Sequence, residues 1–231
     1  MAAAKSGKRP KTAQEAVFAE IRRAILAGRF SPGAQILPDQ LAAEYGVSRV
    51  PVRDALRLLE SEGLVSYAAY HGYQVTQLTE EELLELQRLR EILEDEAVRA
   101  GAPKITDQVV AEMSDALAEM NRHERADDLA SWGQAHRRFH FSLYGAAEMP
   151  SLTRILRQAW DASDLYRSRY LRTRPGRRGM SAGHDPILAA ARARDTDTLL
   201  SLLAQHRGTI VDWLRQAASD GPRVAGTAGG D

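Results

Sequence analysis

The sequence predicts a mostly α-helical protein with two domains, in which three helices and a β-hairpin precede an all-α bundle of six helices. Three observations lead to this prediction. Apolar residues recur at helical spacing along most of the chain, two short stretches on either side of residue 70 alternate with the period of strands, and no strand pattern follows residue 79. A chain of 231 residues is also long enough to bury two cores.

Composition predicts where the folded part of the chain begins and ends. Residues 1–12 form a basic arm and residues 218–231 a tail rich in Gly and Ala, and we expect both to be disordered because they have little apolar surface to pack. The first domain is expected over residues 13–78 and the helical domain over residues 79–217. The whole chain is neutral, but residues 1–77 hold 10 Lys and Arg against 7 Asp and Glu, which gives them a net charge of +3.

The first domain begins with two amphipathic helices. Val17, Ile21 and Ile25 recur on one face of the first helix. A short second helix over residues 41–45 stops at Gly46. Two such helices followed closely by a third predict a helix-turn-helix frame.

The third helix carries the most informative pattern in the chain. Ser48 is placed to cap it by accepting a hydrogen bond from a free N–H group of the first turn. Pro51 is tolerated only in that turn, and Gly63 ends the helix. The buried stripe is predicted to consist of Val52, Ala55, Leu56 and Leu59.

A different face of this helix is cationic, because Arg49, Arg53 and Arg57 follow one another at intervals of four residues. A guanidinium group can make two hydrogen bonds to a guanine edge in the major groove, or it can bind a phosphate. Arginines near the start of such a helix therefore favour the reading of double-stranded DNA. The alternative is an ordinary amphipathic helix with a solvated row of arginines.

Two weakly alternating stretches, residues 64–68 and 73–78, predict a pair of strands after the third helix. Tyr70, His71 and Gly72 lie between them, at the tip of the predicted hairpin. A hairpin in this position is the wing of a winged helix-turn-helix domain.

The order of these elements, with the motif Gly-Val-Ser-Arg-x-Pro-Val-Arg-x-Ala-Leu at residues 46–56, closely resembles the GntR family of bacterial transcription regulators over about residues 13–77. In that family the arginines at the positions of Arg49 and Arg53 enter the major groove, and the wing tip approaches the minor groove. The resemblance implies a DNA-contacting set of Ser48, Arg49, Val50, Arg53, Arg57, His71 and Gly72.

One position departs from the family pattern. Asp39 stands where many relatives have an arginine, just before the short second helix. Its carboxylate would repel phosphate, so we expect the operator sequence or the docking angle to differ from the family norm.

The composition also excludes several kinds of protein. The chain has no cysteine, so it forms no disulfide and offers no thiolate to a metal. No apolar run approaches the ~18 residues needed to cross a membrane, and residues 1–12 lack the apolar core of an export signal. We therefore expect a cytoplasmic protein with no membrane partner.

Helical periodicity predicts six helices after residue 79. They are expected around residues 83–97, 109–120, 132–144, 152–171, 186–193 and 196–216. A capping-box pattern from Thr79 to Glu82 marks the start of the first of them, which places the domain boundary near Leu78.

Four histidines of this bundle lie at or beside the apolar stripes of their helices, so their rings can converge. His136 and His140 are one turn apart, and His184 and His206 belong to two other helices. Neutral imidazoles at i and i+4, joined by ligands from neighbouring helices, can hold a divalent metal. The alternative is a set of core histidines that are satisfied without a metal.

The segment from His136 to His140, the sequence Gly-His-x-Pro-Ile-Leu-x-Ala around His184 and the Gln-His pair that ends at His206 resemble the FCD effector domain of the FadR subfamily of GntR regulators, in its shorter, VanR-like branch. Many members bind a divalent metal through one Asp and three His. The match makes His140, His184 and His206 the imidazole ligands and puts His136 at the Asp position, so whether His136 ligates the metal, contacts an effector or stays unligated is open. Because a neutral histidine replaces a charged aspartate, the site has one ligand charge fewer. This change favours Zn²⁺, with Ni²⁺ as the second choice, over Mn²⁺ or Mg²⁺.

Arg90 falls on the apolar stripe of the first bundle helix, where a guanidinium group needs an anion. Glu94, one turn later, can supply that anion within the chain, or the arginine can snorkel to solvent. The FCD resemblance favours a third interpretation, in which Arg90 binds the carboxylate of a small organic-acid effector.

These predictions describe a homodimeric transcription regulator, a repressor that binds a palindromic operator in double-stranded DNA and senses a small organic acid next to a divalent metal. In one alternative the metal is itself the signal, and in another it is structural or absent. A remote alternative is a metal-dependent hydrolase. The chain lacks the H-E-x-x-H motif, so we predict that it is not an enzyme.

Overall fold

The computed structural model of the protein describes residues 12–173, 181 and 183–219. The arm and the tail predicted to be disordered lie almost entirely outside this part of the chain. Of their residues only Thr12, which caps the first helix, and residues 218–219, which end the last one, are described.

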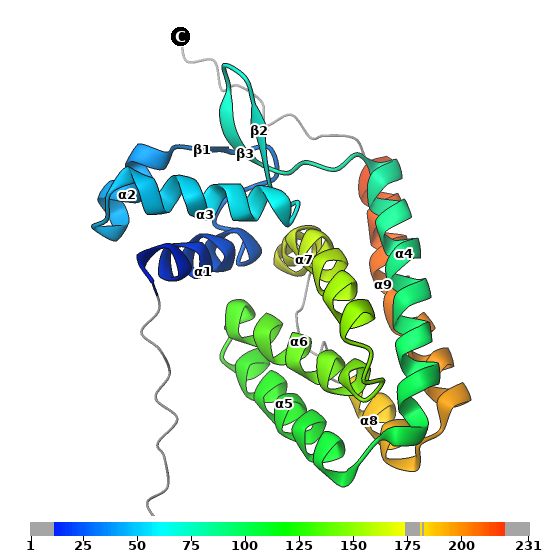
Figure 1. Cartoon of the computed structure of the whole chain (residues 1–231). Coiled ribbons are helices and arrows are strands. Elements are labelled where there is room, and N and C mark those ends of the chain that lie inside the picture. Colours follow the sequence, from blue (N-terminus) through cyan, green and yellow to red (C-terminus); the bar gives the residue numbers. More distant parts are fainter. Residues whose placement is uncertain (1–11, 174–180, 182, 220–231) are drawn as a thin grey trace, which may run out of the picture. The chain divides into compact units, whose positions relative to one another are not determined.

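The chain divides into two compact units between Gln77 and Leu78. The first unit contains α1 (Ala13–Leu26), β1 (Gln35–Ile36), α2 (Pro38–Tyr45), α3 (Arg49–Ser61), β2 (Val65–Ala68) and β3 (Gly72–Val75). Helix α1 packs along α3, and the strands form an antiparallel sheet in the order β1-β3-β2 (Figure 1). This arrangement is the predicted winged helix-turn-helix.

The buried stripe predicted for α3 is confirmed, because Val52, Ala55, Leu56 and Leu59 are all fully buried. Three details differ from the prediction. Helix α2 begins at Pro38 rather than residue 41, so Asp39 lies in its first turn and not before it. Ser48 is the N-cap residue of α3, but its side chain makes no capping hydrogen bond. The third strand, β1, was not predicted, because its two residues are too few to show an alternating pattern; it joins the sheet with Ile36 opposite Tyr73.

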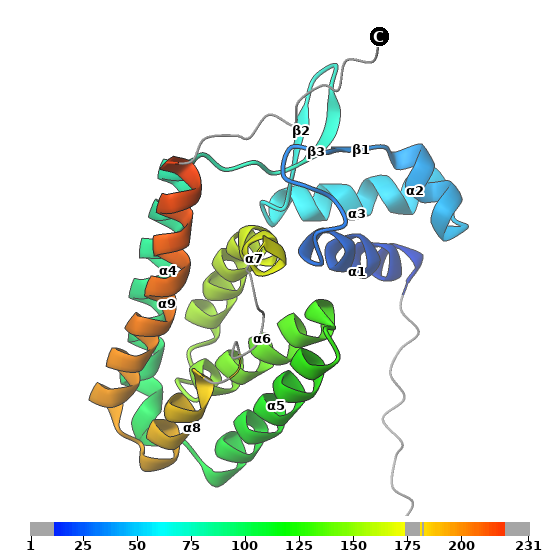
Figure 2. The same cartoon turned by 180° about the vertical axis from the view of Figure 1, so that it is seen from behind.

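All regular secondary structure in the described residues of the second unit is helical, as predicted. It contains α4 (Glu80–Gly101), a short 3-10 helix η1 (Ala102–Lys104), α5 (Asp107–Arg125), α6 (Leu129–Gly145), α7 (Pro150–Thr173), α8 (His184–Ala193) and α9 (Thr196–Ser219). Helices α5 and α6 lie side by side, and α4 packs against α7 and α9 (Figures 1 and 2). The six predicted helices are therefore all present.

The start of α4 has the predicted capping box, in which Thr79 and Glu82 each bond the other's backbone N–H. The far end of α4 makes a close approach to another part of the unit. A Cβ atom added at Gly101 would lie 2.7 Å from the backbone nitrogen of Ala147, just after α6. A residue without a side chain is therefore needed there for α4 to meet the α6–α7 turn.

The bundle core is apolar and largely aromatic around α6. Its largest fully buried side chains are Trp160, Tyr144, Phe139, Ile105, Met113 and Met120. A smaller set of buried polar residues interrupts this core, and several of them form the candidate site described below. None of the helices in the described ranges combines the length and apolar character needed to cross a bilayer.

Candidate metal centre and nucleic-acid interface

The face of α3 opposite its packing stripe carries the predicted arginines. Arg49, Arg53 and Arg57 are all exposed, and Val50 in the first turn is 67% exposed. Ser48, at the N-cap, is exposed as well. Exposed guanidinium groups close to the start of a helix can bond both phosphates and base edges, so this surface has the chemistry that a recognition helix needs.

Two of these arginines contact carboxylates of the same unit. Nε of Arg49 lies 2.8 Å from Oδ1 of Asp39, in the first turn of α2. Nη1 of Arg57 lies 3.9 Å from Oδ1 of Asp54, one turn earlier on α3. The sequence marks Asp39 as a departure from a family pattern, but its contact with Arg49 emerges only from the fold.

The hairpin tip holds both predicted wing residues. Nε2 of Gln35 donates a hydrogen bond of 2.9 Å to the carbonyl oxygen of His71. Gly72 has a φ of 76°, in the left-handed region that favours glycine. Tyr70, which the sequence placed at the hairpin tip without a DNA contact, has a φ of 69° and a completely exposed ring. The exposure of its ring depends on the turn geometry, which the sequence pattern does not show.

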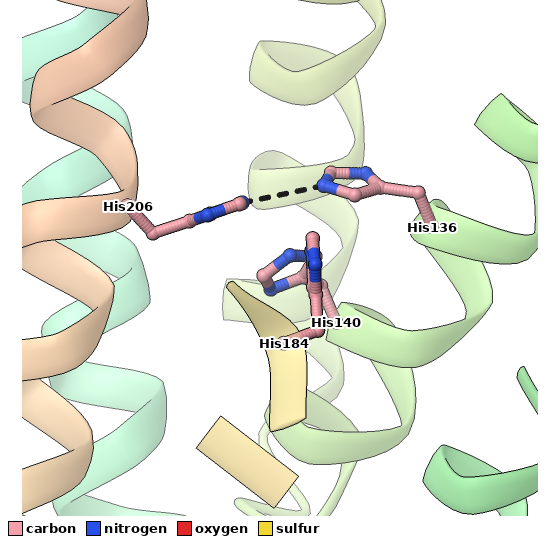
Figure 3. A group of neighbouring side chains, drawn as sticks. All are labelled: His136, His140, His184 and His206. Carbon is pink, nitrogen blue, oxygen red and sulfur yellow. Dashed lines mark hydrogen bonds between the residues drawn. The ribbon is translucent and has the colours of Figure 1, made fainter. Parts of the chain in front are cut away.

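The four histidines singled out in the sequence come together in the second unit. His136 and His140 project from α6, His184 begins α8, and His206 projects from α9 (Figure 3). Their ligand nitrogens all lie within 4.8 Å of one another, and Nε2 of His136 is 3.4 Å from Nε2 of His206. The first three side chains are buried and that of His206 is half-buried.

Neighbouring groups orient these rings. Trp132 stacks on His136, with ring centroids 4.8 Å apart. The carbonyl oxygen of Ser181 lies 3.2 Å from Nδ1 of His184, and the Ser181 hydroxyl accepts a 3.1 Å hydrogen bond from the Trp132 indole. Ser181 therefore contacts both His184 and the tryptophan that stacks on His136. The groups around the ligands of a metal site orient those ligands in the same way.

The donor set fits a transition metal. In a tetrahedral zinc site with Zn–N bonds of about 2.0–2.1 Å, neighbouring nitrogens lie roughly 3.4 Å apart. The pair formed by His136 and His206 has this 3.4 Å spacing, and small ring rotations would bring in nitrogens that lie at up to 4.8 Å. Neutral imidazoles suit Zn²⁺ or Ni²⁺, whereas Mg²⁺ and Ca²⁺ prefer oxygen ligands.

A buried ionic cluster lies beside the histidines. Nε and Nη2 of Arg90 donate to Oε1 of Glu94 at 3.1 and 2.8 Å, and Nη1 donates to the Ser163 hydroxyl at 2.7 Å. Arg207 of α9 donates to Oε2 of Glu94 at 3.0 Å and to Asp95 at 2.8 Å. Of the interpretations of Arg90 that the sequence left open, the structure shows the internal pair with Glu94.

The two arginines keep Glu94 charged. Burial is the largest influence on the Glu94 pKa and raises it, but the positive charges of Arg90 and Arg207 outweigh burial and hold this pKa below the usual 4.5. The pKa of Tyr144 is shifted in the opposite direction. Burial, followed by the negative charge of Glu94, raises the pKa of its phenol well above 10.0, so the phenol stays neutral. The cluster thus contains one carboxylate shared by two cations.

Trp160 connects this cluster to the histidines. Its indole nitrogen donates a 2.6 Å hydrogen bond to Glu94, and Cζ of Arg90 lies 4.3 Å from its ring centroid. The same ring lies 5.2 Å from that of His140 and 5.7 Å from that of His136. The bridging role of Glu94 and the part played by Arg207 were not predicted from the sequence, although Arg207 directly follows His206 in the chain.

Comparison with known proteins assigns a family to each unit. Residues 13–75 match the family described as "Bacterial regulatory proteins, gntR family", and residues 85–209 match the "FCD domain". The second match covers more than half of the chain. Both matches agree with the resemblances stated from the sequence.

The relatives are transcription regulators rather than enzymes. The chain is 28% identical over 141 residues to the "HTH-type transcriptional regulator McbR" of Escherichia coli, a match that spans 61% of this chain and only 64% of that relative. It is 26% identical over 205 residues to the "HTH-type transcriptional repressor GlaR" of the same organism, with 85% of this chain and 93% of that one covered. The solved structure of E. coli McbR/YncC superposes with a TM-score of 0.81 at 25% identity, over 90% of this chain and 99% of that one.

Proposed function

Because the chain belongs to the gntR family of bacterial regulatory proteins and carries an FCD domain, it is a DNA-binding transcription regulator, and we propose that it is a homodimeric repressor controlled by a small carboxylic acid. The relative named as a repressor supports that direction of control. Two copies of one recognition helix read a twofold-symmetric operator, so a palindromic target goes with a dimer. A protein with this target acts in the cytoplasm.

The DNA contacts are assigned to α3 and to the wing. Arg49 and Arg53 read base edges in the major groove, while Arg57 contacts the phosphate backbone. Ser48 and Val50 border the first turn, and the hairpin tip with His71 and Gly72 approaches the minor groove. The exposure of all three arginine side chains supports the assignment.

The metal site is assigned to His140, His184 and His206, with His136 as the fourth ligand. Zn²⁺ is the first choice and Ni²⁺ the second, because all four donors are imidazole nitrogens. A bound metal ion of this kind supplies a Lewis acid that can accept an oxygen atom of an organic acid. The convergence of the four rings within 4.8 Å is the observation that carries this part of the proposal.

The effector site is assigned to the neighbouring ionic cluster. Arg90 is bound by Glu94 and Ser163, so an incoming carboxylate must share or replace these partners. Because Trp160 touches both clusters, an acid held by Arg90 lies within reach of the metal-binding rings. A shift in the helices that carry these residues transmits binding to DNA only if the effector has different affinities for the DNA-bound and free conformations.

Elemental analysis combined with operator titrations tests this proposal. Purified protein is expected to hold about one divalent metal ion per chain, and a carboxylic acid found in a thermal-shift screen is expected to weaken operator binding. His140→Ala should lose the metal, and Arg90→Gln should lose the response to the acid while it keeps the metal. Operator affinity that no carboxylic acid alters at any concentration contradicts effector control.

A second candidate is a regulator for which the metal is itself the signal. The observation that favours it is that Glu94 already satisfies Arg90 inside the protein. In that case removal and return of the metal should switch operator binding with no organic ligand present. If chelation leaves operator binding unchanged but an acid alters it, the first candidate stands.

A further inference from the structure

The contact between Asp39 and Arg49 joins the two helices of the helix-turn-helix at the point where α3 begins. Asp39 is the second residue of α2, and Arg49 is the first residue of α3. Gly46 ends α2 with a φ of 64°, which turns the chain so that the two residues meet. The carboxylate oxygen Oδ1 then lies 2.8 Å from Nε of the arginine.

The closest approach in this ion pair is at the Nε atom of the guanidinium group. A guanidinium group has five N–H donors in one plane, so a carboxylate beside Nε leaves donors on the two terminal nitrogens for another partner. Guanine presents two acceptors, O6 and N7, on its major-groove edge, and two such donors match them. A carboxylate beside Nε therefore limits the rotation of the arginine and leaves its two terminal nitrogens available to a base.

A second carboxylate of α2, that of Glu44, pairs with an arginine in a different geometry. Arg29 donates through both terminal nitrogens to Glu44, at 2.7 and 2.8 Å. That fork is closed on its carboxylate and has no pair of terminal nitrogens left for a base. The comparison shows that α2 holds one arginine in a closed pair and one in an open pair.

Stability does not account for the open pair. Both of its side chains are more than half exposed, and exposed ion pairs of this kind contribute little to folding. The carboxylate also lies on the surface expected to face DNA, where it repels phosphate and weakens non-specific binding. A carboxylate that weakens DNA affinity at this place has a physical reason if it increases the selectivity for one DNA sequence over others.

We infer that Asp39 is a positioning residue for base reading: it holds Arg49 in the orientation that binds guanine with two hydrogen bonds, and it hinders the same arginine from binding phosphate. This inference rests on the proposed DNA-binding role of α3. It assigns the single departure from the family motif a function in specificity, where the sequence alone indicated only repulsion of the DNA backbone.

The test uses the full-length protein and a pool of random-sequence DNA duplexes. Selection with the wild-type protein should enrich a twofold-repeated motif with guanine at a fixed position of each half-site. Selection with Asp39→Asn should lose the guanine preference at that position by about tenfold and keep the other positions. Affinity for the unselected pool should rise severalfold, with a steeper dependence on salt concentration because Arg49 is released to phosphate.

Glu44→Gln is the matched control, because it removes the same charge from the other end of α2. It should leave the preferred sequence unchanged. Asp39→Ser serves as a second variant if the asparagine variant unfolds, as judged by circular dichroism. Base preferences that stay the same in both Asp39 variants, or that weaken equally at all positions, overturn the inference and leave the regulator function intact. If the wild-type protein enriches no sequence at all, the proposed DNA reading itself fails.

Discussion

At the scale of single residues, the arginines of α3 differ in their partners. Arg49 contacts Asp39 and Arg57 contacts Asp54. Arg53 lies between the two arginines on the same exposed face of the helix. Equal spacing in the sequence therefore does not imply equal roles. The helical period predicted which face these residues share, but the Asp39 carboxylate beside Arg49 depends on how the turn brings α2 to α3.

We expect Arg53→Ala to weaken operator binding by about 1–3 kcal/mol and to relax the base preference at one position per half-site, because a base contact is lost. Arg57→Ala should weaken binding to all sequences alike and reduce the salt dependence, because a phosphate contact is lost. Binding isotherms at several salt concentrations separate the two effects. If the two variants behave identically, the division of roles between them is wrong.

Glu94 is the residue on which the buried charges of the second unit depend. Glu94→Gln removes the negative charge that Arg90 and Arg207 share, so we expect it to lower the free energy of unfolding at neutral pH by about 3 kcal/mol. Chemical denaturation of the wild type and the variant measures this difference. Glu96→Gln, at an exposed position of the same helix, is the control and should change stability little.

The same variant should change the dependence of stability on pH. The Glu94 pKa is lower in the folded state than its usual 4.5, so its contribution is complete above that value and is lost as the pH falls below it. The gap in unfolding midpoint between the wild type and Glu94→Gln should therefore narrow between about pH 5 and pH 3. A gap that is constant over this range would show that the Glu94 pKa is the same in the folded and unfolded states.

At the scale of secondary-structure elements, the sequence predicted the helices well because each buries a stripe with a period near 3.6 residues. The two-residue strand β1 has no such repeat, and it exists only because β3 offers a free edge. The same reasoning applies to the site. Helical spacing placed the four histidines toward the core, whereas the bridge from Glu94 to Arg207 joins residues on α4 and α9 that no local pattern connects.

The packing of α4 against the α6–α7 turn gives a prediction at this scale. Gly101→Ala would improve the helix propensity of α4 by about 1 kcal/mol if the site were open. The added Cβ atom would lie 2.7 Å from the Ala147 nitrogen, and backbone cannot move aside as a side-chain end can. We therefore expect a net destabilisation of about 1–3 kcal/mol by chemical denaturation. Gly133→Ala, on α6 with open space around its Cβ position, should instead be neutral or stabilising.

The wing is unusual in its charge, because residues 65–75 contain no Lys, Arg, Asp or Glu. In the proposed complex with DNA, such a wing offers only apolar and hydrogen-bonding groups, and the fully exposed Tyr70 ring is the largest of them at the tip. We expect Tyr70→Ala to weaken operator binding by roughly 1 kcal/mol and to leave the salt dependence unchanged, because no ion pair with phosphate is lost. A changed salt slope in this variant would argue against a charge-free contact.

At the scale of the whole molecule, the sequence predicted a DNA-binding regulator with a second, helical FCD domain, and the two matched families agree with that prediction. The identity of the family was visible because its motif is local and lies on one helix. The geometry of the histidine cluster was less visible, because residues 70 positions apart, such as His136 and His206, meet only in the folded bundle.

The histidine cluster joins α6, α8 and α9, so a metal ion bound there crosslinks three helices of the second unit. A ligand that binds only the folded state stabilises it by mass action, and at a free concentration 100 times the dissociation constant the gain is about 2.7 kcal/mol. We expect Zn²⁺ to raise the unfolding temperature of metal-stripped protein by several degrees, and His140→Ala to abolish the rise. His123→Ala removes a histidine of α5 that lies outside the cluster and pairs with Asp128, so it should keep the full response. Equal responses of the two variants would show that zinc binds elsewhere on the chain.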